Sequence, residues 1–208
     1  MIKAVLFDVD GVLIDSFESN LQFFRDLLDS AGYQCPTRQA LLKVHHLTMK
    51  DTIKTFAPEA SDEEVEKLWD KGRTREMPYP DHLVVEPTGV EETLKELSES
   101  MVLGVVTSRV KEGIYSIPLL AKVENFFQVT VGYQDTENHK PDPEPLLFAA
   151  RQLKIDPKEM IYIGDMEADL LAGVAAGMKV ILYKNELEGA DGYASSFEEL
   201  PELIASLS

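Results

Sequence analysis

Residues 4–16 read AVLFDVDGVLIDS, a stretch that joins a short apolar run to two aspartates. Ala4 to Phe7 is predicted to be a strand, because a short apolar run bounded by turn signals is typical of one. Asp8 and Asp10 follow two residues apart, so in extended chain both side chains point to the same side. Gly11 then allows the chain to turn away. The stretch therefore predicts two carboxylates at the carboxyl end of a strand.

Outward from this stretch, short apolar runs alternate with segments of helical period. The predicted strands are Ala4 to Phe7, Met101 to Val106, Phe127 to Val131, Met160 to Ile163 and Lys179 to Leu182. The predicted helices are Gly89 to Ser100, Pro143 to Leu153 with Asp142 as its N-cap, and Phe197 to Leu207. Such alternation predicts an α/β fold, a doubly wound and mostly parallel sheet with a Rossmann-like core.

Residues 17–83 interrupt the alternation, because they offer helical patterns and loops but no convincing strand. Ser61 and Glu64 form the signature of a capping box at the start of one helix. Trp69 falls on the inner face of that helix and is expected in the core of the insertion. We therefore predict an α/β core made of residues 1–16 and 84–208, and an inserted helical domain made of residues 17–83.

Composition argues against several classes of partner. The 208 residues include 20 Lys and Arg against 37 Asp and Glu, a formal net charge of -17. A surface this acidic repels nucleic-acid backbones and anionic lipids, so neither is an expected partner. The chain offers no long apolar segment, and its single cysteine, Cys35, is expected to be a small buried side chain. These features predict a cytoplasmic protein.

A second acidic segment, YIGDMEAD at residues 162–169, also follows a predicted strand. Asp165 ends the strand, and Asp169 lies in the first turn of the next helix, where side chains lean back toward the N-terminus. With Asp8 and Asp10, four carboxylates would then converge at one edge of the sheet. Two such charges 4 Å apart repel by about 4 kcal/mol at an effective dielectric constant of 20. A cation would offset this repulsion, and oxygen ligands favour Mg²⁺.

Two further segments carry groups suited to an anion. VVTSR at residues 105–109 places the hydroxyl of Thr107 at a strand end, next to backbone N–H groups that could bind oxygen atoms. NHKPDPEP at residues 138–145 contains Lys140, which Pro141 is expected to hold extended. A lysine fixed near the acidic edge would supply positive charge for a phosphate, although most lysines are solvated.

The four segments together, in this order and at these separations, closely resemble the haloacid dehalogenase superfamily over nearly the whole chain. The resemblance is strongest to the phosphoglycolate phosphatase and beta-phosphoglucomutase branch, in which a helical cap is inserted after the first motif. It implies that Asp8 is the nucleophile that forms an aspartyl-phosphate. Asp10 would protonate the leaving oxygen and then activate water. Mg²⁺ would be held by the Asp8 carboxylate, the Asp10 main-chain carbonyl and Asp165.

The resemblance also assigns the groups around the phosphate. Thr107 and Lys140 would hold its oxygen atoms, and Asp169 would support Lys140 or a metal-bound water. The further substrate-binding residues that we expect are Ser108 and Arg109 beside Thr107, and His46 and Lys50 in the cap.

The residues at two positions indicate which of the superfamily's reactions this chain is expected to catalyse. Asp10 favours phosphoryl transfer, because the dehalogenases lack an acid there. Asn20 stands where beta-phosphoglucomutases usually carry a histidine, which weakens the mutase alternative. The expected function is a Mg²⁺-dependent phosphatase acting on a small phosphorylated metabolite such as phosphoglycolate, as a monomer or homodimer. Pyrophosphate, nucleotides, a phosphosugar mutase and a catalytically silent binding module remain as alternatives.

Overall fold

The computed structural model describes all 208 residues, which form two compact units. The first unit consists of Met1–Asp15 and Glu86–Ser208, and the second of Ser16–Val85. The chain therefore leaves the first unit just after the DVDGVLID segment and returns to it 70 residues later.

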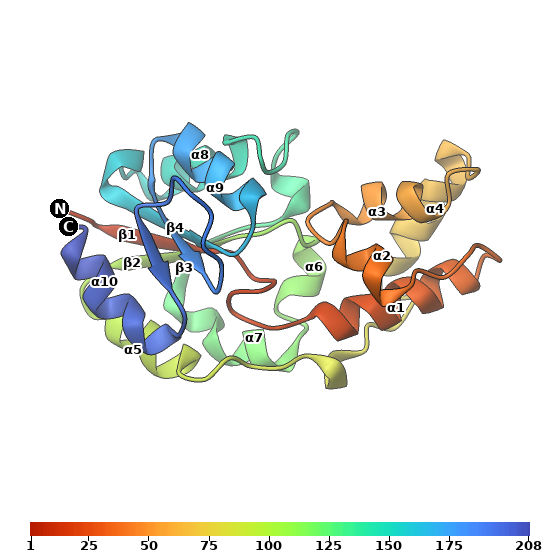
Figure 1. Cartoon of the computed structure of the whole chain (residues 1–208), viewed down its shortest axis with the longest axis horizontal. Helices are drawn as coiled ribbons and strands as arrows, with labels where there is room; N and C mark the ends of the chain where they lie inside the picture. The colour runs from red at the N-terminus through yellow and green to blue at the C-terminus, as the bar shows by residue number, and fades with distance from the viewer. The chain divides into compact units, whose positions relative to one another are not determined.

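A six-stranded sheet forms the centre of the first unit, with every neighbouring pair of strands parallel (Figure 1). Its strands are β1 (Ala4–Phe7), β2 (Val102–Val106), β3 (Phe127–Val131), β4 (Met160–Gly164), β5 (Lys179–Tyr183) and β6 (Gly192–Ala194). They lie in the order β3-β2-β1-β4-β5-β6, which confirms the predicted doubly wound α/β fold. The sequence did not predict β6, because its three residues carry no apolar run.

Helices cover both faces of this sheet. They are α5 (Val90–Ser98), α6 (Lys111–Ile114), α7 (Pro118–Val123), α8 (Glu144–Leu153), α9 (Glu167–Ala176) and α10 (Leu200–Ser206), with 3₁₀ turns at Glu124–Phe126, Tyr133–Asp135, Pro157–Glu159 and Phe197–Glu199. Helices α8 and α9 pack on one face, and α5 packs with α10 on the other (Figure 1).

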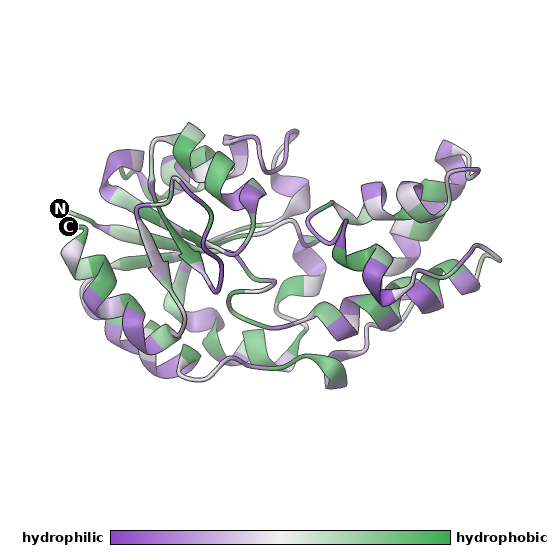
Figure 2. Ribbon diagram, in the orientation of Figure 1, coloured by the Kyte–Doolittle hydropathy of each residue, from purple (hydrophilic) through white to green (hydrophobic).

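The central strands β1 and β4 are buried at every residue, as their apolar sequences predict. Figure 2 shows the hydrophobic colour of the strands in the sheet. Helix α9 approaches the sheet closely because it carries small residues, among them Ala172 and Gly173. A Cβ atom added at Gly173 would lie only 2.4 Å from Cγ2 of Val180 on β5. The small residues therefore fix the distance between α9 and the strands β4 and β5.

The second unit is helical, as predicted. Its elements are α1 (Phe17–Asp29), α2 (Arg38–Leu42), α3 (Met49–Phe56), α4 (Asp62–Arg73) and a 3₁₀ turn at Asp81–Leu83. The capping box at the start of α4 is present: the Glu64 N–H donates to Ser61 Oγ, and the Ser61 N–H donates to the Glu64 carboxylate. Trp69 packs against the apolar core of these helices.

Two local expectations were wrong. Cys35 is exposed, because it lies in the loop after α1 and not on an apolar face. Helix α8 begins at Glu144 with Pro143 as its N-cap, one residue later than predicted, although Asp142 Oδ1 still accepts the Glu144 N–H. No helix is long and apolar enough to span a bilayer.

Candidate active site

The site lies where β1 and β4 end side by side. The two strands pair in parallel with Phe7 opposite Ile163, and the Asp8 N–H continues the pairing by donating to the Ile163 carbonyl at 2.9 Å. Chain connections run outward in opposite directions from these two strands, because β2 and β3 lie on one side and β5 and β6 on the other. Such a switch point leaves a crevice at the carboxyl ends of the strands. Asp8 and Asp165 both lie there.

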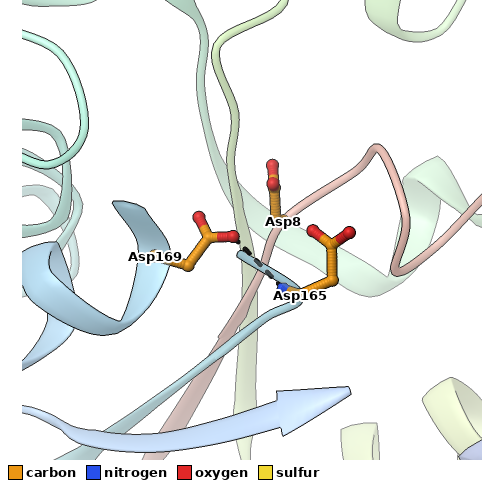
Figure 3. A group of neighbouring side chains, drawn as sticks. All are labelled: Asp8, Asp165 and Asp169. Atoms are coloured by element: carbon orange, nitrogen blue, oxygen red, sulfur yellow. Dashed lines mark hydrogen bonds between the residues drawn. The ribbon is translucent and has the colours of Figure 1, made fainter. Parts of the chain in front are cut away.

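Three carboxylates meet at this edge. Asp8, Asp165 and Asp169 each offer an oxygen atom, and these atoms all lie within 4.8 Å of one another (Figure 3). Asp10 does not belong to this group, because both of its carboxylate oxygens bind Arg109. The expected convergence of four carboxylates is therefore a cluster of three, with the fourth side chain held beside it.

Two glycines make room for these carboxylates. A Cβ atom at Gly11 would lie 2.1 Å from Asp165 Oδ2, and the φ angle of +77° at Gly11 also disfavours any other residue. A Cβ atom at Gly164 would lie 2.3 Å from the Cβ of Asp169. Sequence reasoning gave Gly11 only the role of a turn. The structure shows that both glycines also set how closely the acidic side chains approach.

Asp169 is fully engaged with protein donors. Its Oδ2 accepts the backbone N–H groups of Asp165 and Met166 at 3.2 and 3.0 Å. Its Oδ1 accepts from Lys140 Nζ at 2.6 Å and from the Tyr162 hydroxyl at 2.9 Å. Asp169 therefore holds the start of α9 and the lysine, and the resemblance implied contact with either Lys140 or a metal-bound water.

Lys140 is buried, with 6% of its side chain exposed, so the solvated lysine that residue statistics favour is not found here. Its ammonium group lies 3.0 Å from Asp8 Oδ2, 2.6 Å from Asp169 Oδ1 and 2.8 Å from the Tyr162 hydroxyl. Three oxygen partners match the three protons of an ammonium group. The lysine is consequently fixed against the Asp8 carboxylate from two sides.

Tyr162 is the residue of this site that sequence reasoning missed. It lies on β4, is fully buried, and connects Lys140, Asp169 and the carbonyl of Val106. Burial, and then the neighbouring carboxylates, raise the pKa of its hydroxyl well above the ordinary value, so it stays protonated. A tyrosine within an otherwise apolar buried strand was the available signal, because a buried hydroxyl needs a polar partner.

Burial dominates the electrostatics of the cluster. It raises the pKa of Asp8 to about 7, with Asp169 and Asp10 adding to the rise and Lys140 opposing it. Burial also raises the pKa of Asp165 to about 8, followed by repulsion from Asp8 and Asp169. For Lys140, burial alone would lower the pKa, but attraction to Asp169 and Asp8 outweighs it and the pKa rises. Near neutral pH, the two aspartates thus retain protons that a cation would displace.

The loop after β2 carries the expected anion-binding residues. Thr107 is buried at the end of the strand, and its Oγ1 accepts the Arg109 N–H at 3.2 Å. Ser108 is half-buried between them. Arg109 turns its guanidinium group toward Asp10, so the structure places it beside the acid of the first motif.

The expected cap residues lie in the second unit, where their contact with a substrate stays a prediction. Lys50 stacks over the Trp69 ring at 4.3 Å and pairs with Glu66 at 2.6 Å. His46 is exposed. Asn20 accepts from the Tyr79 hydroxyl and donates to Ser16, so its amide holds the beginning and end of this unit together.

The donor set fits Mg²⁺. Asp8 and Asp165 contribute hard carboxylate oxygens from adjacent strand ends, the ligands that Mg²⁺ prefers. Burial, and then the neighbouring carboxylates, raise the pKa of both side chains, so a bound cation would stabilise their ionised forms. Asp169 is a poorer ligand, because its oxygens already accept four hydrogen bonds.

The fold and these residues are those of a haloacid dehalogenase-like hydrolase. Residues 5–183 match the model of that family, and the chain belongs to it. It is 34% identical over 179 residues to the pyrophosphatase PpaX of Bacillus pumilus, covering 86% of this chain and 81% of the relative.

Solved structures agree with this assignment. A haloacid dehalogenase-superfamily hydrolase of subfamily IA from Geobacter sulfurreducens is 29% identical, with a TM-score of 0.73 over 98% of this chain and 96% of that one. A haloacid dehalogenase-like hydrolase from Bacteroides fragilis shares the fold with a TM-score of 0.84 at 23% identity, over 96% of this chain and 100% of that one.

Proposed function

We propose that this protein is a Mg²⁺-dependent phosphatase that hydrolyses a small phosphorylated metabolite through an aspartyl-phosphate on Asp8. The observation that carries the proposal is the buried cluster in which Lys140 is fixed between Asp8 and Asp169, next to Asp165. The leading substrates are a phosphate monoester such as phosphoglycolate and, from the name of the PpaX relative, inorganic pyrophosphate. Nucleic acids and membranes are not partners in this proposal, given the net charge of -17.

Asp8 attacks the phosphorus atom, and the bond to the leaving oxygen breaks as the new bond to the carboxylate forms. The geometry supports this role: the Val9 N–H holds Asp8 Oδ1 at 2.7 Å, and Lys140 holds Oδ2 at 3.0 Å. Asp10 gives a proton to the leaving oxygen. Water then attacks the phosphorylated Asp8 and returns a proton to Asp10, which releases inorganic phosphate.

The side chains of Asp8 and Asp165 and the main-chain carbonyl of Asp10 would hold the metal. When bound, Mg²⁺ supplies positive charge that orients the phosphate and offsets its repulsion from the aspartates. Lys140 lowers the remaining repulsion, because its ammonium group lies 3.0 Å from Asp8 Oδ2. Tyr162 and Asp169 keep the lysine there while the charge on Asp8 changes.

Binding of Mg²⁺ should strengthen as pH rises. The pKa values of Asp8 and Asp165 are raised to about 7 and about 8, so both must lose protons before a cation can bind. The folded chain holds these protons more tightly than the unfolded chain, so metal-free protein should lose stability as pH rises from about 4 toward 8. We expect the Mg²⁺ affinity to increase by at least about tenfold between pH 6 and pH 8.

Calorimetric titration with Mg²⁺ and melting curves with and without the ion would measure both effects. The Asp165→Asn variant should bind Mg²⁺ more weakly and with a smaller pH dependence, because only the titration of Asp8 remains. The Asp29→Asn variant, changed at an exposed position of α1, should keep the wild-type pH dependence. An affinity that is flat from pH 6 to pH 8 would contradict this assignment of the ligands.

Phosphate release from a panel of phosphorylated metabolites tests the function itself. With Mg²⁺ present, we expect inorganic phosphate from phosphoglycolate or pyrophosphate, and little without the ion. Beta-glucose 1-phosphate with a bisphosphate activator tests the mutase alternative, because isomerised sugar without free phosphate would identify a mutase. Asn20 favours the phosphatase over the mutase, because it replaces the usual histidine of the mutases and its amide is hydrogen-bonded to Tyr79 and Ser16. No reaction across the panel would revive the silent binding module.

We also place the protein in the cytoplasm. Cys35 is the single cysteine, so no intrachain disulfide can form, which fits a reducing compartment.

A further inference from the structure

Arg109 and Asp10 form a bidentate ion pair that has no role in the reaction steps proposed above. Arg109 Nε donates to Asp10 Oδ2 and Nη2 donates to Oδ1, both at 2.7 Å. The arginine side chain is only 13% exposed and that of Asp10 is 35% exposed. Paired, short, charge-assisted hydrogen bonds of this kind are among the strongest polar contacts in proteins. The acid of the first motif is therefore held firmly in the free protein.

The backbone of Arg109 is anchored on both sides. Its N–H donates to Thr107 Oγ1 at 3.2 Å, and its carbonyl accepts the Tyr133 N–H at 2.8 Å. Gly132 allows this close contact, because a Cβ atom there would lie 3.1 Å from the Arg109 carbonyl oxygen. The guanidinium group thus extends from a fixed point at the carboxyl end of β2.

The pair conflicts with the task of Asp10. Both carboxylate oxygens bind Arg109, yet one of them must reach the leaving oxygen of the substrate to deliver a proton. Lys140 cannot take over the arginine's role, because its three protons already have protein partners. When Asp10 turns to the substrate, the mostly buried guanidinium group loses two short, charge-assisted hydrogen bonds, and an anion that replaces Asp10 would restore them.

We propose that Arg109 recognises the leaving group: it holds Asp10 in the free enzyme and exchanges it for a negative charge on the leaving group when substrate binds. This inference rests on the proposed phosphatase function and narrows its substrate class. The preferred substrates carry a second anionic group next to the transferred phosphoryl group, as a carboxylate or a further phosphate. Esters with a neutral leaving group offer no anion to replace the two hydrogen bonds that Arg109 makes to Asp10.

Two matched substrates test this exchange. Phosphoglycolate carries a carboxylate on its leaving group, and hydroxyethyl phosphate carries a neutral hydroxyl group at the same place. We expect the wild-type kcat/KM to favour phosphoglycolate. Arg109→Met should lower kcat/KM for phosphoglycolate by about 10- to 100-fold and change that for hydroxyethyl phosphate by less than about threefold. Arg109→Lys should keep part of the preference for phosphoglycolate, because lysine retains the positive charge but lacks the paired N–H donors of the guanidinium group.

Lys111→Met is the matched control. It removes one positive charge two residues away, where Lys111 is exposed at the start of α6 and pairs with Asp135 in the 3₁₀ turn after β3. Its substrate preference should equal that of the wild type. If circular dichroism shows that Arg109→Met does not fold, Arg109→Lys takes its place in the test. A partial loss of its preference for phosphoglycolate supports the inference, and an unchanged preference contradicts it.

Several results would overturn the inference. An equal loss of kcat/KM on both substrates in Arg109→Met would show that the arginine only positions Asp10, and an absent wild-type preference would remove the basis for the exchange. If the wild type hydrolyses no phosphate ester, the proposed function fails separately. Calorimetry on Asp8→Asn with the same two compounds then decides the inference: a preference for phosphoglycolate that disappears in Asp8→Asn/Arg109→Met supports it, and equal affinities refute it.

Discussion

Replacing Asp8 by asparagine should lower turnover by at least about 10⁴-fold, because an amide cannot attack phosphorus in place of the carboxylate. Asp169 is a poor substitute nucleophile, because its carboxylate already accepts four hydrogen bonds. Steady-state phosphate release with the best substrate of the panel measures the loss. The fold should survive, since asparagine has nearly the same size and shape.

The controls for this variant separate chemistry from folding. Asp29→Asn makes the same chemical change at an exposed residue of α1 and should keep wild-type rates. Asparagine can deamidate back to aspartate, so Asp8→Ala should show the same loss and mass spectrometry should verify the preparation. Wild-type-like turnover in a verified Asp8→Asn sample would rule out Asp8 as the nucleophile.

Replacing Asp10 by alanine should slow turnover of an alkyl phosphate by about 10²- to 10⁴-fold, the range expected for a positioned acid-base group. The effect should depend on the leaving group. Transfer of the phosphoryl group from p-nitrophenyl phosphate needs no proton, so its kcat/KM should fall much less than that of the alkyl ester. Hydrolysis of the phosphorylated Asp8 still needs a base. The kcat of the variant with p-nitrophenyl phosphate should therefore fall, and the phosphorylated form of Asp8 should accumulate.

Acid-quench trapping of the phosphorylated protein, together with kcat/KM for the two esters, measures this pattern. Asp10→Asn keeps a hydrogen-bonding partner for Arg109 and should show the same dependence on the leaving group. An equal loss of kcat/KM on both esters, with no trapped phosphoenzyme, would mean that Asp10 acts through the structure of the loop and not through proton transfer.

The sequence predicted the parts of this site that follow from local geometry. Asp8 and Asp165 lie together because each follows an apolar strand, and the parallel fold brings neighbouring strand ends to one edge. The position of Asp169 next to Asp165 followed from the direction of side chains in a first helical turn. Such inferences need only the periodicity of each element and the alternation of strands and helices along the chain.

The remaining features depend on contacts between distant segments. The Arg109 pair with Asp10 joins residues 99 positions apart, and nothing in either segment indicates which of several acids the arginine would choose. The three contacts of Lys140 likewise join it to Asp8, Tyr162 and Asp169, which all lie far from it in the sequence. Strand β6 has three residues, fewer than a periodic pattern needs to be recognised.

Gly11 and Asp165 also restrict how this chain can diverge. The glycine stands in the first motif and the aspartate in the second, yet 2.1 Å separates the aspartate oxygen from the position of any β-carbon at residue 11. A mutation that adds even one methyl group at residue 11 must displace an acid encoded 154 codons away. We therefore expect homologues that bind the ion to retain both Gly11 and Asp165, because a larger residue at position 11 would displace the aspartate.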